Sequence, residues 1–185
     1  MAYGVVFTTN ILNAKTLSFQ SAEDLENGFF VTKGDLVAGE TEIYEAVKPV
    51  TADFHRKAYL VSMPAVNYDD SRPSNQNEEN FINVAGTPFR VYDFEANDKF
   101  KVTDYTLDGA VAEGNYVTLA DDSYKLNASA TVVFRDFGFI GKIERIEDMG
   151  YFYYVGQLGK DSILGVPGVD GRVKMVTISI IKNDN

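Results

Sequence analysis

Short runs of aromatic and β-branched residues recur along the chain, and most are bounded by Gly, Asp, Asn or Pro. Such runs have the length and composition of β-strands, and the residues between them are typical of turns. No window carries a sustained apolar stripe at helical spacing, so long helices are not expected. The runs cover residues 3–8, 16–20, 28–34, 41–47, 57–63, 81–86, 87–94, 98–105, 114–126, 129–137, 138–150, 151–157 and 172–181.

Strands at this spacing, with turn signals between them, predict an all-β protein with minimal helix, either an antiparallel barrel or a sandwich with Gly- and Asp-rich turns. Residues 21–28 suit one helical turn or a tight connector. Residues 34–41 and the Asp121-Asp122-Ser123 segment are expected to turn hairpins. In the last run the alternation breaks near Val176-Thr177, which predicts a β-bulge or a strand buried on both faces.

Three segments stand apart from this pattern. Residues 67–80 contain no aliphatic side chain and predict a long polar loop that is either functional or mobile. Residues 158–171 are rich in Gly and are also expected to be loop. Residues 1–15 have mixed polarity and are a candidate for an extended arm. Within this arm, residues 5–12 could pair with an exposed edge strand of a neighbouring protein.

We expect one β-rich domain over residues 1–185. Residues 28–36 and 114–122 share the pattern Gly-x-aromatic-Val-Thr followed by an acidic turn. Coincidence is the simpler explanation, because Gly and Asp recur in most turns. Two related β-subdomains are the alternative, with a boundary near residues 95–110.

The amino-acid composition limits the classes of binding partner that we expect. The chain has 17 Lys and Arg against 27 Asp and Glu, a net charge of −10, and no basic run. Binding to nucleic acid needs concentrated positive charge, and an acidic surface repels anionic membranes, so neither partner is expected. The absence of Cys excludes disulfides and thiol catalysis. The N-terminus lacks the pattern of a signal peptide, and no apolar run approaches the roughly 20 residues that span a bilayer. We therefore expect synthesis in a cytoplasm.

No catalytic constellation is visible. His55, the single histidine, has no Ser, Cys or second His at motif spacing. The acid pairs Asp69-Asp70, Glu78-Glu79 and Asp121-Asp122 are expected to be solvated turn residues. A calcium site in residues 67–80 stays open as an alternative, although the spacing is not that of an EF-hand. We expect a protein that is not an enzyme and that has no cofactor and no metal site.

The aromatic run Tyr151 to Tyr154 places rings on both faces of one strand. Such a strand either is central, with both faces buried, or presents aromatic rings to a partner, because Tyr and Phe are enriched at interfaces. The sequence leaves both interpretations open. For a partner interface we select residues from this run, from the arm and from the polar loop: Val5, Phe7, Ile11, Tyr68, Arg72, Tyr151 and Tyr153.

Four segments carry a resemblance to a known family: LENGFFVTKGDLVAGETEIYEAVKP (25–49), YLVSMPAVNYDDSRP (59–73), NFINVAGTPFRVYDFEANDKFKVT (80–103) and LDGAVAEGNYVTLADDSYKL (107–126). Over these segments, about two thirds of its length, the chain resembles auxiliary structural proteins of tailed bacteriophages, encoded near the major capsid protein in phages of Gram-positive hosts. The last 50 residues have no counterpart in it.

The resemblance implies a decoration or cement protein without a catalytic site. Such a protein binds the outer surface of the phage head at subunit junctions and stabilises it. The implied partners are the major capsid protein and other copies of the chain, often as a trimer, and the implied location is the virion. An alternative is a carbohydrate- or receptor-binding module of a phage fibre or tail. A hydrolase that uses paired acids is a third.

Overall fold

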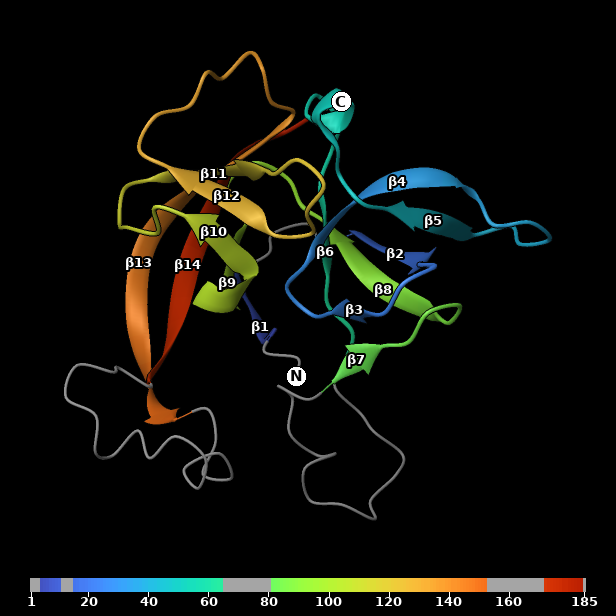
Figure 1. Ribbon diagram of the computed structural model, residues 1–185, viewed down its shortest axis with the longest axis horizontal. Helices are drawn as coiled ribbons and strands as arrows, with labels where there is room; N and C mark the ends of the chain where they lie inside the picture. Colours follow the sequence, from blue (N-terminus) through green and yellow to red (C-terminus); the bar gives the residue numbers. More distant parts are fainter. Residues whose placement is uncertain (1–3, 11–14, 65–80, 153–171, 185) are drawn as a thin grey trace.

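The structure, a computed structural model, describes residues 4–10, 15–64, 81–152 and 172–184. Within these ranges it is built from β-strands and two single-turn 3-10 helices, η1 (Thr51–Asp53) and η4 (Asp104–Thr106). A small closed barrel lies beside a larger open sheet (Figure 1). The predicted all-β class with minimal helix is therefore confirmed.

Five strands close the barrel in the order β2-β5-β4-β6-β8. Neighbours run antiparallel except for β2 and β5, which are parallel. Alternate side chains of a strand face opposite sides, so every second residue fills the interior. The strands are β2 (Lys15–Gln20), β4 (Phe30–Leu36), β5 (Ile43–Val47), β6 (Tyr59–Val61) and β8 (Pro88–Asp93). The inner cluster contains Phe19, Leu25, Val31, Tyr59, Val61, Phe89 and Val91.

The open sheet has seven strands in the order β1-β9-β14-β13-β11-β12-β10. Here β10 and β12 run parallel, and β14 lies in the interior between β9 and β13. The strands are β1 (Val6–Asn10), β9 (Lys99–Thr103), β10 (Leu107–Gly109), β11 (Tyr116–Leu119), β12 (Leu126–Ser129), β13 (Phe139–Phe152) and β14 (Arg172–Asn183). A third, two-stranded sheet pairs β3 (Leu25–Glu26) with β7 (Ile82–Asn83).

The barrel and the open sheet share a hydrophobic core. On β4, Val31 belongs to the barrel interior, whereas Phe30 belongs to the shared core. The Phe30 ring centroid lies 5.7 Å from that of Phe100 and 5.4 Å from that of Phe139, both in the open sheet. All three residues of β6 are buried, because one side of this strand faces the barrel and the other side faces the sheet. The described residues therefore pack as one body.

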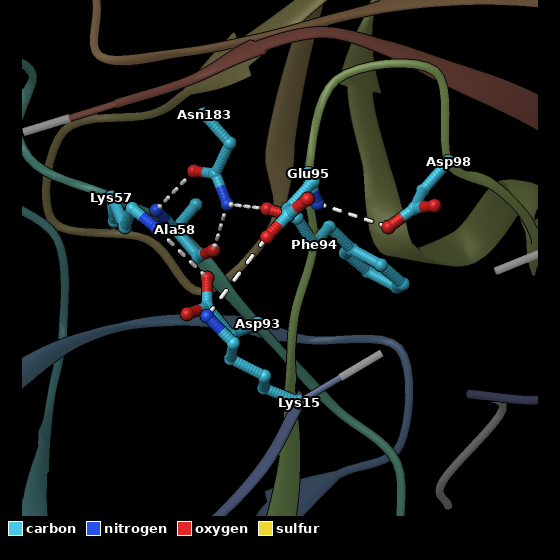
Figure 2. A network of polar contacts seen from close by, with 8 residues as sticks. All are labelled: Lys15, Lys57, Ala58, Asp93, Phe94, Glu95, Asp98 and Asn183. Atoms are coloured by element: carbon cyan, nitrogen blue, oxygen red, sulfur yellow. Dashed lines mark hydrogen bonds and ion pairs between the residues drawn. The ribbon is translucent and has the colours of Figure 1, made fainter. Parts of the chain in front are cut away.

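A buried amide joins the end of β14 to the barrel. Figure 2 shows Asn183 between two barrel segments: its Oδ1 accepts a hydrogen bond from the Ala58 N–H at 3.0 Å, and its Nδ2 donates to the carbonyls of Ala58 and Phe94 at 3.2 and 2.9 Å. Beside it, Lys57 pairs with Asp93 at 3.2 Å. The chain passes from barrel to sheet just after this point, between the end of β8 and the start of β9.

The prediction of a strand over residues 129–137 is wrong. β12 ends at Ser129, and residues 130–137 form an irregular loop. The neighbours of β12 explain this end: β10 last pairs with it at Gly109↔Ala128, and β11 begins at Tyr116↔Ser129. Beyond Ser129, neither β10 nor β11 continues beside the chain to pair with it.

Residues 153–157 of the predicted strand 151–157 lie outside the described residues, and the other predicted strands agree in position with observed ones, with two refinements. Residues 139–152 form one strand, β13, where two separate runs were predicted. The break in alternation near Val176-Thr177 has both predicted causes, a β-bulge and burial on both faces of the strand. Met175 and Val176 are both buried, and β13 has an extra residue between Ile143 and Arg145, opposite β14. The connector 21–28 contains no helix. The Ser21 Oγ accepts the Glu23 N–H at 3.0 Å, and β3 follows.

Candidate docking surfaces

The residues selected for a partner interface fall in different environments. Val5 is 4% exposed, so its side chain packs inside this chain, whereas Phe7 on β1 is 41% exposed. Within the predicted arm, Val6–Asn10 form the edge strand β1, which pairs with β9. Tyr151 lies in β13. The candidates Ile11, Tyr68, Arg72 and Tyr153, and the calcium alternative in residues 67–80, lie outside the described residues.

The hairpin of β13 and β14 extends beyond its neighbours in the sheet (Figure 1). β9 pairs with β14 only from Met175 to Ser179, and β11 pairs with β13 only at Gly141 and Lys142. The two outer pairs, Asp148↔Lys174 and Phe152↔Arg172, are separated by a register irregularity and have no third strand beside them in the described part of the chain. We call residues 148–152 and 172–174 the ribbon. A two-stranded ribbon is at best marginally stable in water, so a surface packed against it would stabilise it.

The loop from β12 to β13, residues 130–137, presents an exposed apolar tip, and we call it the wedge loop. Val133 is 52% exposed and Phe134 is 46% exposed. A turn forms the tip, in which the Asp136 N–H donates to the Val133 carbonyl at 3.0 Å. The Phe134 ring meets the Tyr116 ring edge-on at 5.7 Å. Figure 1 shows this loop rising clear of the strands.

The base of the wedge loop is held firmly. Lys182 donates to the Phe137 carbonyl at 2.9 Å, and the Phe137 ring lies 5.2 Å from the Phe54 ring. At Gly138 the backbone is enclosed, because a Cβ there would come within 2.3 Å of the His55 carbonyl oxygen. A loop fixed at its base presents its tip with less ordering entropy left to lose on binding.

Paired charges cover one face of the open sheet. Lys99 on β9 pairs with Glu144 on β13 at 2.7 Å, and Lys101 pairs with Glu147 at 2.6 Å. Both pairs reach across β14, the strand that lies between β9 and β13. The hydrogen bonds from these lysines hold the pKa of Glu144 and of Glu147 below the usual range. This face is polar and its described charges largely compensate one another.

An open pocket of about 580 Å³ lies between the barrel and the β11–β12 turn. We call it the acid-rimmed pocket, because Glu23, Glu45 and Asp122 line it with a single cation, Lys48. The Lys48 ammonium lies 3.8 Å from Glu23 and 3.7 Å from Asp122. Apolar lining comes from Ala22, Val37, Ala46 and Val47.

Tyr124 closes one side of this pocket. Its ring stacks on Phe29 at 5.9 Å, and the Lys48 ammonium lies 5.1 Å above the ring. The ring therefore contacts one aromatic and one cationic neighbour. Its hydroxyl donates to Glu23 at 3.3 Å, and burial together with the Glu23 charge raises the pKa of Tyr124 to about 12.

A second pocket, of about 500 Å³, is lined by the single histidine and by the cationic side chains of Lys33, Arg56 and Lys57. Arg56 pairs with Asp53 at 3.1 Å, and the Lys33 ammonium lies 3.5 Å from the Tyr44 ring centroid. His55 is exposed, and the described lining includes no Ser or Cys to act as its nucleophilic partner. The described lining residues are Lys33, Gly34, His55, Arg56, Lys57 and Tyr59.

The acid pair Asp121-Asp122 forms part of the turn in the β11–β12 hairpin. Asp122 has the left-handed φ of 48°, and the Asp121 Oδ1 accepts the Thr51 N–H at 2.7 Å. These hydrogen bonds hold the pKa of Asp121 below its usual value. Across the described ranges, no three His, Cys, Asp or Glu side chains gather as a metal site would require. None of the helices described there has the length and apolarity to cross a bilayer.

Comparisons with protein-family models, with curated proteins and with solved structures found no match. The docking residues must therefore be judged on geometry alone. Val133 and Phe134 are not among the residues selected from the sequence, because TVVF has the composition of a strand and predicts one. No local signal in that segment marks it as an exposed loop.

Proposed function

We propose that the protein is a virion structural protein that decorates the head of a tailed phage, where it binds the outer surface at subunit junctions and stabilises the shell. The sequence resemblance to phage auxiliary proteins motivates the proposal. The observation that supports it best is the ribbon, residues 148–152 and 172–174, which extends past the sheet without a third strand.

The ribbon suits contact with a shell for a physical reason. Two strands alone bury little apolar surface, and their outer edges keep unpaired backbone groups. Packing on a capsid subunit would cover both. The ribbon includes Tyr151 and Phe152, residue types that are enriched in interfaces. Durable attachment needs roughly 1,000 Å² of buried surface, and repetition over a symmetric shell multiplies the effect.

The test is binding to shells of the encoding phage that were assembled without this protein. Wild-type protein is expected to co-sediment with the shells and to saturate at a fixed number of copies per capsid subunit. The double variant Tyr151→Ser with Phe152→Ser should bind at least about tenfold more weakly, since truncated interface aromatics commonly cost more than about 1.4 kcal/mol.

The matched control replaces two exposed apolar residues elsewhere, Ile82→Ser with Val84→Ser, which are 39% and 57% exposed. This variant should bind like the wild type. Absence of saturable binding by the wild-type protein would contradict the shell function. If both double variants lost shell binding to the same extent, the ribbon would not be the binding surface.

A further inference from the structure

The wedge loop carries apolar surface and an accessible cation together. Val133 and Phe134 are both exposed, and the side chain of the next residue, Arg135, is 88% exposed. The one ion pair described for Arg135 is with its neighbour Asp136, at 3.4 Å. A partner that fits this tip offers an apolar hollow with negative charge at its rim.

The acid-rimmed pocket of the same chain has this chemistry. Its apolar lining, which we call the floor, includes Val37 and Val47, and its charged lining, which we call the rim, has three carboxylates against one lysine. Lys48 divides its charge between Glu23 and Asp122. Among the described residues, no cation pairs with the Glu45 carboxylate. The pocket volume of about 580 Å³ lies in the range of sites that enclose a small ligand, so it has room for two apolar side chains.

Both features belong to one hairpin but lie at opposite ends of it. Phe134 contacts Tyr116, where β11 begins, whereas Asp122 and Tyr124 lie in the turn after β11. Three residue steps along β11 correspond to about 10 Å. The wedge loop, fixed at Gly138, is thus separated from the pocket of its own chain.

We propose that the wedge loop of one copy occupies the acid-rimmed pocket of a second copy, with Val133 and Phe134 on the apolar floor and Arg135 at the carboxylate rim. Because the two contacting surfaces differ, the contact is head-to-tail, and repetition around an axis closes a ring. The assembly does not depend on a shell, so it stands or falls separately from the proposed function.

Sedimentation velocity of the purified full-length chain tests the proposal. Wild-type protein is expected to associate reversibly into a closed ring. Val133→Asp places a carboxylate on the floor, and Ala22→Arg adds bulk and positive charge to the pocket lining. Each should weaken association at least about tenfold. The matched controls Val84→Asp and Ala96→Arg change exposed residues outside both surfaces and should associate like the wild type.

A mixing experiment separates head-to-tail contact from any symmetric contact. Val133→Asp protein keeps a working pocket, and Ala22→Arg protein keeps a working wedge loop. Together they should form a heterodimer with one copy of each that grows no further. The charge contact has its own test: Arg135→Glu should weaken association, and Glu45→Arg in the same chain should restore it.

Circular dichroism and thermal melting first establish that each variant is folded. A wild-type chain that stays monomeric at its highest soluble concentration would overturn the proposal. So would folded Val133→Asp and Ala22→Arg proteins that associate like the wild type, or a mixture of the two that stays monomeric. The ribbon variant Tyr151→Ser with Phe152→Ser should still form the ring.

Discussion

The barrel and the open sheet deal differently with the unpaired backbone at the edge of a β-sheet. In the barrel every strand has two neighbours, so no edge remains. In the open sheet β1 and β10 have one neighbour each, and the ribbon extends beyond the other strands. The wedge loop, with its exposed tip, also connects two strands of the open sheet, β12 and β13.

The difference indicates a division of tasks. The closed barrel is a rigid support, because its strands pair on both sides and its wall faces two cores. The open sheet carries the elements that we assign to partners. The acid-rimmed pocket draws lining residues from both parts, with Glu45 from the barrel and Tyr124 from the sheet's hairpin turn.

The strongest way to break this comparison is to damage the shared core. Phe30→Ala should lower the free energy of unfolding by about 3–5 kcal/mol, because it removes a fully buried ring between β4 and the open sheet. Barrel and sheet should unfold in one transition, measured by urea titration with circular dichroism and Tyr fluorescence. Val84→Ala, at an exposed site, should change stability by no more than about 0.5 kcal/mol. A barrel that melts first would contradict a shared core.

Removing the buried amide should have the next largest effect. Asn183→Ala leaves the Ala58 N–H and the carbonyls of Ala58 and Phe94 without their side-chain partner. We expect a loss of roughly 2–4 kcal/mol, and faster hydrogen exchange at the Ala58 amide. Asp184→Ala, at the exposed neighbouring position, should leave that exchange rate unchanged. Unaltered exchange in the Asn183 variant would show that this contact does not join the two parts.

High pH should lower the stability of the protein through Tyr124, which lies where the barrel and the open sheet meet at the acid-rimmed pocket. The pKa of Tyr124 rises from 10.0 to about 12 on folding, so the folded protein binds this proton more tightly. The stabilisation is complete below pH 10 and is lost as the pH rises toward about 12. Tyr124→Phe should remove this part of the decline. Denaturant unfolding of both proteins across this range measures it, and parallel curves would contradict it.

The smallest effect is expected on the charged face of the open sheet. The hydrogen bond from Lys99 lowers the pKa of Glu144, so its contribution is present above the ordinary value of 4.5 and is lost as the pH falls through the lowered value. Glu144→Gln should flatten the acid side of the stability curve slightly. Glu42→Gln, in the barrel's β4–β5 hairpin, is the control and should not. Thermal melting in acidic buffers compares the two variants.

The repeated pattern in residues 28–36 and 114–122 illustrates what a sequence predicts. Gly28 and Gly114 both adopt left-handed φ angles, of 89° and 87°, and each is soon followed by a strand. Local chemistry is sufficient for that geometry, because only Gly adopts it at no steric cost. The two strands nevertheless enter different parts of the fold, β4 the barrel and β11 the open sheet. Strand partners depend on residues far away in the chain.

The docking surfaces were harder to predict for the same reason. The wedge loop has the residues of a strand and becomes a loop because β10 and β11 provide no partner beyond Ser129. The acid-rimmed pocket combines segments near residues 20–23, 45–48 and 122–124, which no short pattern connects. Phe7 and Tyr151 were selected from the sequence alone. Their role in a partner interface stays a prediction.

The position of β14 has a consequence for biosynthesis. Because β14 lies between β9 and β13, the sheet exists only as separate halves until residues 172–183 have left the ribosome. The nascent chain can close the barrel earlier, since all five barrel strands precede residue 94. Assembly that depends on the complete open sheet would therefore wait until residues 172–183 have been made.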